Sequence, residues 1–471
     1  MSQDPRYHIE KISESVIGTK FEDIDKTTVH IGKLRILDLI GCALYGAMSN
    51  ASKNLADLVT SWGGKKESTI LAFGGKVPAS NAAMVNSAVT RTTDYEAIGA
   101  LVEGVDLPSH VSSTTVYTAL ALGEAQNASG KKTLASMLVG DDAAARLLAA
   151  SGVLGGKNFE WGWDGNGTAN AFGATALAGN MLGLNKKQMK DAFGLILNQM
   201  GSTFQNLWDY SLAAALTSAH SARNAICSAE MAKVGWDGPN DALFSRYGYF
   251  FLFTDGCADA DILTKDIGKT FYSEATFKPY PSCRTTHAAV DCALKFISEH
   301  EIDTSKIADV QIVLPPRMKT MFTAQIPFKV HDTNYQVFAE NSIAYCVATV
   351  LLRKEMKIDY LEEQYVRDPK IADIATKATI EDLELEDLKV KCAQLIVKTN
   401  DGKVYTSEIK AARGGYRDGL FTDEDVKSKF RYNVQYSKIL SKDTGEKIID
   451  MVDNLEQVDN INELTKLLVR N

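Results

Sequence analysis

The chain has 471 residues, of which 45% are hydrophobic and 23% charged, and its formal net charge is −8. This composition is typical of a globular protein and excludes collagen-like, low-complexity and wholly disordered chains. The acidic balance argues against a nucleic-acid partner, which requires a basic face. It leaves a small anionic ligand open, because a few cations gathered in a cleft act locally.

The cysteine content and the hydropathy of the chain indicate its cellular compartment. The seven cysteines are scattered and form no CxxC pair. Such a set is typical of reduced thiols and not of a disulfide framework or a zinc site. The polar N-terminal segment lacks the apolar core of a secretory signal, and no run of 18 apolar residues occurs. We therefore expect a cytoplasmic protein without membrane association.

The first 270 residues favour helices. Ala-rich segments punctuated by Gly are apolar around most of their circumference, which is typical of helices buried on several sides. The predicted helices cover residues 33–49, 79–92, 113–126, 142–153, 168–183 and 211–234.

The pattern changes after residue 272. Residues 308–314 alternate with period two and predict a strand, and residues 394–397 and 404–409 flank Asn400-Asp401-Gly402, which predicts a hairpin. Helices are expected at 287–300 and 341–353, and again from Thr422, a suitable N-cap, to the C-terminus.

These elements predict a mainly α protein with an inserted α+β unit. The last sixty or so residues are too few to form a domain alone, so we expect them to pack on the first helices. The predicted organisation is a large all-helical domain built from residues 1–272 and 412–471, and a smaller α+β lid domain of residues 273–411. At roughly 150 residues per domain the length predicts two or three domains, and the patterning favours one helical domain interrupted by a lid.

Common cofactor motifs are absent from the sequence. We find no Walker A loop, no GxGxxG after a strand, no GxSxG and no HExxH. For an enzyme, this favours chemistry without a cofactor or a metal ion.

One candidate site lies on a loop between two predicted helices. Asp94 ends one helical segment and His110 opens the next. A carboxylate and an imidazole at the two ends of one loop suit general acid–base catalysis. The alternative is that His110 is a surface loop residue and Asp94 a polar helix cap.

A second candidate site lies at the domain junction, in the segment Lys278-Pro-Tyr-Pro-Ser-Cys-Arg-Thr-Thr-His287. Two prolines keep the segment extended up to Cys283, where a helix is expected to begin. A helix start next to Lys278 and Arg284 makes a good carboxylate receptor. Alternatively the segment is a structural linker; Cys283 and His287 have the spacing of metal ligands but no third ligand is evident.

Together these motifs resemble the MmgE/PrpD family, which includes 2-methylcitrate dehydratase, cis-aconitate decarboxylase and iminodisuccinate epimerase. The resemblance rests on residues 86–96, on His110-Val-Ser-Ser and on the junction segment. It also covers residues 33–46, Leu182-Gly-Leu184, Arg223-Asn224, residues 235–238 and the tail from Arg413 to Lys429-Phe430. It spans nearly the whole chain.

The resemblance implies a helical domain with an α+β lid, usually as a homodimer, and cofactor-free chemistry on small polycarboxylates in a cleft between the domains. It places Asp94, His110 and Lys278 on family site positions. Cys283 falls where the decarboxylases carry His or Cys.

Three departures from the family pattern argue against cis-aconitate decarboxylation. Ile98 replaces a Thr, Asp164 replaces a His and Ala214 replaces a Lys. The last two replacements remove cations that would contact carboxylates, so we expect a less anionic or differently placed substrate than a tricarboxylate.

The mechanism expected from these residues is proton transfer at a carbon next to a carboxylate. His110 would act as general base or acid, oriented by Asp94, while Lys278 would stabilise the activated carboxylate and Cys283 or Tyr280 would donate a proton. The other candidate substrate-binding residues are Arg284, His287 and Asp164. We expect a dehydratase-type lyase; the alternatives are a dicarboxylate epimerase and a non-catalytic carboxylate binder.

Overall fold

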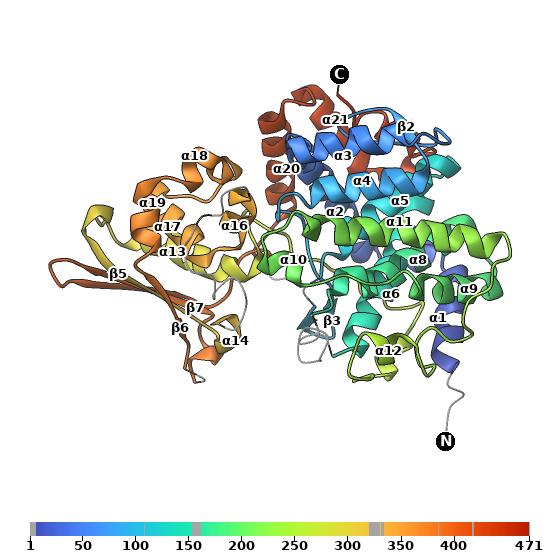
Figure 1. The fold of residues 1–471 in the computed structure, drawn as a ribbon, viewed down its shortest axis with the longest axis horizontal. Helices are drawn as coiled ribbons and strands as arrows, with labels where there is room; N and C mark the ends of the chain where they lie inside the picture. Colours follow the sequence, from blue (N-terminus) through green and yellow to red (C-terminus); the bar gives the residue numbers. More distant parts are fainter. Residues whose placement is uncertain are drawn as a thin grey trace.

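The computed structural model describes residues 6–107, 109–152, 162–319, 330, 334–384, 386–416 and 419–470. All candidate site residues lie within these ranges. Figure 1 shows two parts joined side by side, with helices on one side and a small sheet covered by helices on the other.

The N-terminal part is helical. Its helices are α1 (Tyr7–Gly18), α2 (Lys26–Gly46), α3 (Asn50–Ser61), α4 (Ala79–Thr90), α5 (Val111–Gln126), α6 (Gly130–Ala150), α8 (Ala169–Leu182), α9 (Lys186–Leu197), α10 (Gln205–Trp208), α11 (Ala213–Lys233) and α12 (Tyr249–Leu252). Two short antiparallel pairs lie between them: β1 (Ser68–Thr69) with β2 (Lys76–Val77), and β3 (Leu101–Val102) with β4 (Val105–Asp106).

Small residues allow these helices to approach closely. A Cβ atom on Gly173 of α8 would lie 2.4 Å from the carbonyl oxygen of Gly140 on α6. The two helices therefore touch through their main chains, as the Ala-rich and Gly-rich segments predict.

The C-terminal part carries a four-stranded sheet. Its strands are β5 (Ile307–Leu314), β6 (Ala378–Asp382), β7 (Ala393–Thr399) and β8 (Val404–Ile409), in the order β6-β5-β7-β8. The predicted hairpin β7–β8 is antiparallel, and β6, which the sequence analysis missed, pairs in parallel with β5. The helices are α13 (His287–Glu299), α14 (Pro316–Lys319), α16 (Tyr335–Asn341), α17 (Ile343–Arg353), α18 (Glu363–Val366) and α19 (Pro369–Ala375).

The C-terminal tail returns to the first helices. It forms α20 (Asp423–Ser437), α21 (Lys442–Asp453) and α22 (Asn462–Thr465). Thr422 caps α20 by accepting a hydrogen bond from Asp425 N, as expected from the sequence. Helix α20 packs against α2 (Figure 1). Val469 forms a parallel bridge with Ala72.

Two hydrophobic cores follow this arrangement. The larger core runs from Ile9 to Phe277 and resumes from Phe421 to Leu468. The smaller core lies almost entirely between Tyr280 and Val397. The mainly α fold with a small sheet-containing region is confirmed, and the domain boundaries at residues 272 and 412 stay a prediction.

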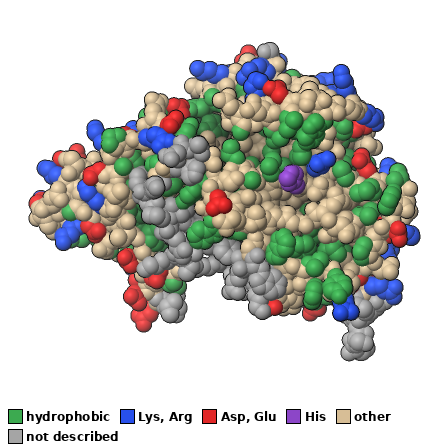
Figure 2. Space-filling view, viewed as in Figure 1, with side chains coloured by type: hydrophobic (Ala, Val, Ile, Leu, Met, Phe, Trp, Pro, Cys, Tyr) green, Lys and Arg blue, Asp and Glu red, His purple; other side chains and the backbone are tan. Residues whose placement is uncertain are grey.

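On the face shown in Figure 2, Lys and Arg side chains lie in separate groups among acidic and apolar ones, without a continuous basic surface. Within the described residues, every helix is too short or too polar to cross a membrane.

Candidate active site

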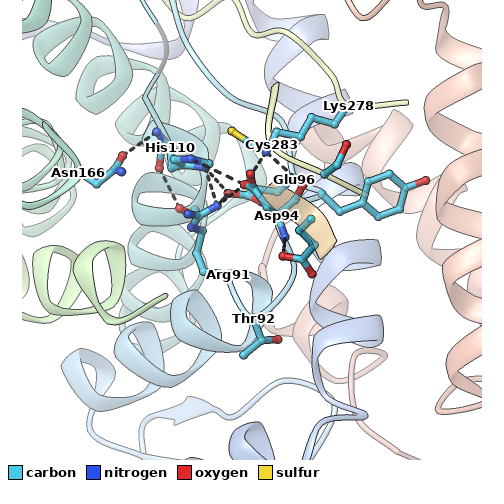
Figure 3. A network of polar contacts seen from close by, with 12 residues as sticks. Arg91, Thr92, Asp94, Glu96, His110, Asn166, Lys278 and Cys283 are labelled. Atoms are coloured by element: carbon cyan, nitrogen blue, oxygen red, sulfur yellow. Dashed lines mark hydrogen bonds and ion pairs between the residues drawn. The ribbon is translucent and has the colours of Figure 1, made fainter. Parts of the chain in front are cut away.

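The Asp94 loop and the junction segment are joined through their main chains. Ile98 and Thr276 exchange two N–H···O hydrogen bonds of 2.9 Å, and Thr276 also bridges to Gly415. The predicted site residues of both segments therefore lie together, and Figure 3 shows them converging from the loop, from the start of α5 and from the junction.

His110, at the N-cap of α5, is bound by Glu96. Its Nδ1 lies 2.5 Å from Glu96 Oε1, whereas its Nε2 lies 3.8 Å from Asp94 Oδ1, too far for a hydrogen bond. The expectation that Asp94 orients the imidazole was therefore wrong; the carboxylate two residues later on the same loop does so.

Arg91, at the end of α4, connects both carboxylates. Its Nη1 lies 2.8 Å from Asp94 Oδ1, 2.6 Å from Glu96 Oε1 and 2.7 Å from His110 Nδ1. Because Nη1 carries two hydrogens and both carboxylates can only accept, these hydrogens go to Asp94 and Glu96. His110 then donates from Nδ1 to Glu96, and its Nε2 lone pair is left available to accept a proton.

Lys278 is fully buried and already paired. Its Nζ donates to Asp94 Oδ1 at 2.6 Å and to the Asp94 carbonyl oxygen at 3.2 Å. An ammonium group has three hydrogens, so one N–H remains for a ligand.

Burial and the neighbouring charges determine the protonation states of His110, Asp94 and Glu96. Burial lowers the pKa of His110, and Arg91 lowers it further, although Glu96 and Asp94 act in the opposite direction. Burial alone would raise the pKa of Asp94, but Lys278 and Arg91 hold it well below its usual range. Arg91 and His110 likewise overcome burial and lower the pKa of Glu96. At neutral pH the two carboxylates are therefore charged and the imidazole is a neutral base.

Glu340, on α16 of the C-terminal part, contacts both candidate segments. Its Oε2 accepts the Asp94 N–H at 3.1 Å, its Oε1 accepts from Gln336 at 2.7 Å, and its main-chain oxygen accepts the Cys283 N–H at 2.9 Å. Burial, together with the charge of Asp94, raises the pKa of Glu340 to about 8. No local motif of the sequence indicates this residue, because its contact with Asp94 spans 246 positions.

Cys283 supplies a protonated thiol at the site. It precedes a 3-10 turn (Arg284–Thr286). Helix α13 begins at His287, as the predicted helix 287–300 does, and the expectation of a helix start at Cys283 was wrong. Thr285 Oγ1 donates to its sulfur at 3.2 Å. Burial raises the pKa of the Cys283 thiol, and the charge of Asp94 raises it further.

The remaining junction candidates bind protein groups. Tyr280 donates to Asp291 at 2.5 Å, and Arg284 donates to the Arg413 carbonyl at 2.5 Å. His287 is fully buried, and its Nε2 lies 3.1 Å from the Ser282 carbonyl. These contacts tie the junction to α13 and to the returning chain, and the predicted roles of the three residues in substrate binding stay predictions.

Asp164 acts on His110 through Asn166. Its Oδ1 caps a 3-10 turn by accepting the Asn166 N–H at 2.9 Å. Asn166 Oδ1 in turn accepts the main-chain N–H of His110 at 2.7 Å and a hydrogen bond from Asn170 at 3.1 Å. Asn166, which the sequence analysis did not select, thus fixes the start of α5 beside the imidazole.

One group of side chains among the described residues has the composition of a metal site. Ligand atoms of Asp94, Glu96 and His110 lie within 4.8 Å of one another. Arg91 and Lys278 donate to the same carboxylate oxygens. Because these two cations already neutralise the carboxylates, a divalent cation would have to displace them or bear their repulsion.

Comparisons with known proteins identify the family of this chain. Residues 10–259 match the MmgE/PrpD N-terminal domain and residues 280–457 match the MmgE/PrpD C-terminal domain. The chain is 21% identical to the cis-aconitate decarboxylase of Homo sapiens over 471 residues, which cover 98% of this chain and 94% of the relative. It is 22% identical to the Mus musculus protein of the same name, covering 98% and 93%. It is 21% identical to that of Aspergillus terreus, covering 95% and 93%. The two matches together span most of its length, and the chain belongs to the MmgE/PrpD family.

Proposed function

We propose that this protein is a cofactor-independent lyase of the dehydratase type, which removes a proton next to a carboxylate of a small substrate. Family membership and the relatives support lyase-type chemistry on a carboxylate. The observation that carries the proposal is the contact of His110 Nδ1 with Glu96 Oε1 at 2.5 Å, which leaves Nε2, 3.8 Å from Asp94 Oδ1, open to a ligand.

In the proposed reaction, His110 Nε2 takes the proton. The Nδ1–H···Glu96 hydrogen bond holds the ring in one tautomer and stabilises the imidazolium that forms. Negative charge develops on the substrate carboxylate as the proton leaves. The remaining N–H of Lys278 is a suitable donor for that charge, and a buried ammonium acts strongly on it because little water screens it.

The local charges support a substrate less anionic than a tricarboxylate. Asp94 and Glu96 already balance Arg91 and Lys278, and a neutral His110 adds no charge. Each carboxylate that a ligand carries in addition to the one at Lys278 would therefore add uncompensated negative charge. For this reason cis-aconitate decarboxylation is not our proposal, although relatives carry that name.

Cys283 supports the second candidate function, epimerisation of a dicarboxylate. An epimerase requires a proton donor on the face opposite the base. The Cys283 thiol is protonated and only partly buried, whereas Tyr280 is bound to Asp291.

A deuterium-exchange experiment tests the proposal. The protein is incubated in D₂O with a panel of hydroxy and unsaturated dicarboxylates, and deuterium uptake and product formation are followed by NMR. We expect His110→Ala to lower the rate at least about 100-fold, as for removal of a general acid–base. The control is His300→Ala, because His300 lies at the end of α13 and contacts the Thr406 carbonyl.

The outcomes separate the candidates. Loss of water from a deuterated substrate supports the lyase, and inversion without loss supports the epimerase. Thermal stabilisation by a dicarboxylate without any exchange favours the non-catalytic binder. Exchange that persists in His110→Ala at the wild-type rate refutes the assignment of His110.

We also propose a cytoplasmic homodimer, as the family resemblance implies, and no nucleic-acid partner, in line with the net charge of −8. Light scattering in solution tests the dimer: a mass of one chain at micromolar concentration contradicts it.

A further inference from the structure

A buried ion pair lies directly beneath the Asp94 loop. Asp38 of α2 and Lys429 of α20 are joined at 2.7 Å, with side-chain exposures of 0% and 4%. Lys429 belongs to the tail motif that the sequence analysis singled out, and the proposed reaction gives neither residue a role.

The pair holds the main chain on both sides of Glu96. Lys429 Nζ donates to the Tyr95 carbonyl oxygen at 2.6 Å, and Asp38 Oδ2 accepts the Ala97 N–H at 2.8 Å. The Lys429 ammonium also lies 3.8 Å from the centroid of the Tyr95 ring. Two residues from distant parts of the chain thus fix the neighbours of Glu96.

The contacts of Asp38 and Lys429 do more than attach the C-terminal tail to α2. Burial of an ion pair costs free energy unless its remaining hydrogen-bonding capacity is used. Here it is used on the peptide groups that flank Glu96, whose carboxylate must meet His110 Nδ1. A displacement of the Glu96 main chain by an ångström would break a contact of 2.5 Å.

We propose that Asp38 and Lys429 are positioning residues that hold Glu96 against His110. This inference rests on the proposed function only in taking His110 as the proton-transfer group. It makes α20, near the C-terminus, necessary for the geometry of a loop that lies more than 300 positions earlier.

The test reads the position of Glu96 through the pKa of His110, measured by NMR on full-length protein labelled at histidine Cε1. Glu96 raises the pKa of His110 against the effect of burial, so displacement of Glu96 should lower it. We expect Lys429→Met to lower the midpoint by about half a pH unit or more, in the same direction as Glu96→Gln. The His110 signal is assigned by its absence from His110→Asn.

A matched control separates positioning from tail anchoring. Lys33 of α2 also binds the C-terminal tail, donating to the Asp453 carbonyl at 2.7 Å and pairing with Glu456 at 3.0 Å. Lys33→Met should leave the midpoint of His110 unchanged.

Different titratable groups surround the His110 imidazole and the ion pair of Asp38 and Lys429. Those acting most strongly on the imidazole are Arg91, Asp94 and Glu96. Those next to the buried pair are Cys42, Tyr95, Tyr117 and Glu96, and Lys278 acts on both Cys42 and Glu96. Loss of the Lys429 cation would by itself raise the midpoint of His110, so a lower midpoint in Lys429→Met reports on a displaced Glu96.

Folding of the variants is verified first by circular dichroism. If Lys429→Met leaves too little folded protein, the double variant Asp38→Asn/Lys429→Met removes both charges and no longer buries an unpaired one. It should still show the shift, because the Tyr95 carbonyl has lost its donor. A folded single or double variant with the wild-type midpoint overturns the proposal.

Activity provides a separate readout. With a substrate found by deuterium exchange, the positioning variants should lower kcat about 10-fold or more with little change in KM. If no carboxylate exchanges with wild-type protein, the proposed function fails while the midpoint of His110 still decides the positioning role.

Discussion

Replacement of Glu340 by Gln should change how the stability of the protein depends on pH. Burial and the charge of Asp94 raise the pKa of Glu340 from an ordinary value of 4.5 to about 8. The unfolded chain therefore releases this proton at a lower pH than the folded protein. Stability that the protonated carboxyl contributes below pH 4.5 is lost as the pH rises to about 8.

The size of this effect follows from the shift. At about 1.4 kcal/mol per pKa unit, the wild type should lose about 5 kcal/mol relative to Glu340→Gln across that range. Gln cannot ionise and replaces one of the two acceptor oxygens with a donor, so the variant bears a penalty that is constant with pH. Its relative stability should thus rise from pH 5 to pH 9.

Urea unfolding followed by circular dichroism at pH 5, 6, 7, 8 and 9 measures the difference. Glu463→Gln, at an exposed position of α22, is the control for the substitution of Glu by Gln itself. A difference between Glu340→Gln and wild type that stays constant across the range refutes the reasoning, because it would mean that Glu340 is ionised in the folded protein at neutral pH.

Two further changes test the site and the packing. Lys278→Ala should lower kcat/KM for a carboxylate substrate at least about 10-fold, because it removes the charge-assisted donor for the substrate carboxylate, and the pKa of Asp94 should rise toward its usual range without this partner. Steady-state kinetics measure the effect, and an unchanged kcat/KM contradicts the role of Lys278 as this donor. Gly173→Ala should cost about 1–3 kcal/mol of stability, seen as a lower Tm, because its Cβ would lie 2.4 Å from a main-chain oxygen of α6. Gly18→Ala, which meets nothing within 4 Å, is the control, and equal Tm values for both variants refute the packing argument.

Patterning predicted the mainly α fold because apolar periodicity and caps act over short distances. The strand β6 was missed for the same reason: its sequence Ala-Thr-Ile-Glu-Asp alternates over only four residues and has no fully buried one. It becomes a strand through its parallel pairing with β5, about seventy positions earlier, a contact that local propensity does not encode.

The loop that carries Asp94 and Glu96 gives a second example of a contact that local sequence patterns do not encode. The spacing led us to predict that Asp94 orients His110, whereas Glu96 does so in the structure. The choice follows from anchors distant in sequence: Asp38 holds the Ala97 N–H across 59 positions, and Lys429 holds the Tyr95 carbonyl across 334. With the main chain fixed on both sides, Glu96 faces the imidazole and Asp94 faces Lys278.

Asp164, which stands where the family resemblance places a His, has a structural role in this protein. By resemblance, a cationic His at this position would contact a substrate carboxylate. Here a carboxylate instead caps the turn that holds Asn166, which fixes the main chain of His110. The carboxylate at this position is thus connected to the main chain of His110, the general base of our proposal. In that proposal the substrate has fewer carboxylates than a tricarboxylate and needs fewer cations. The negative net charge of the whole chain does not oppose the binding of a small carboxylate, because the paired cations Arg91 and Lys278 lie within the site itself.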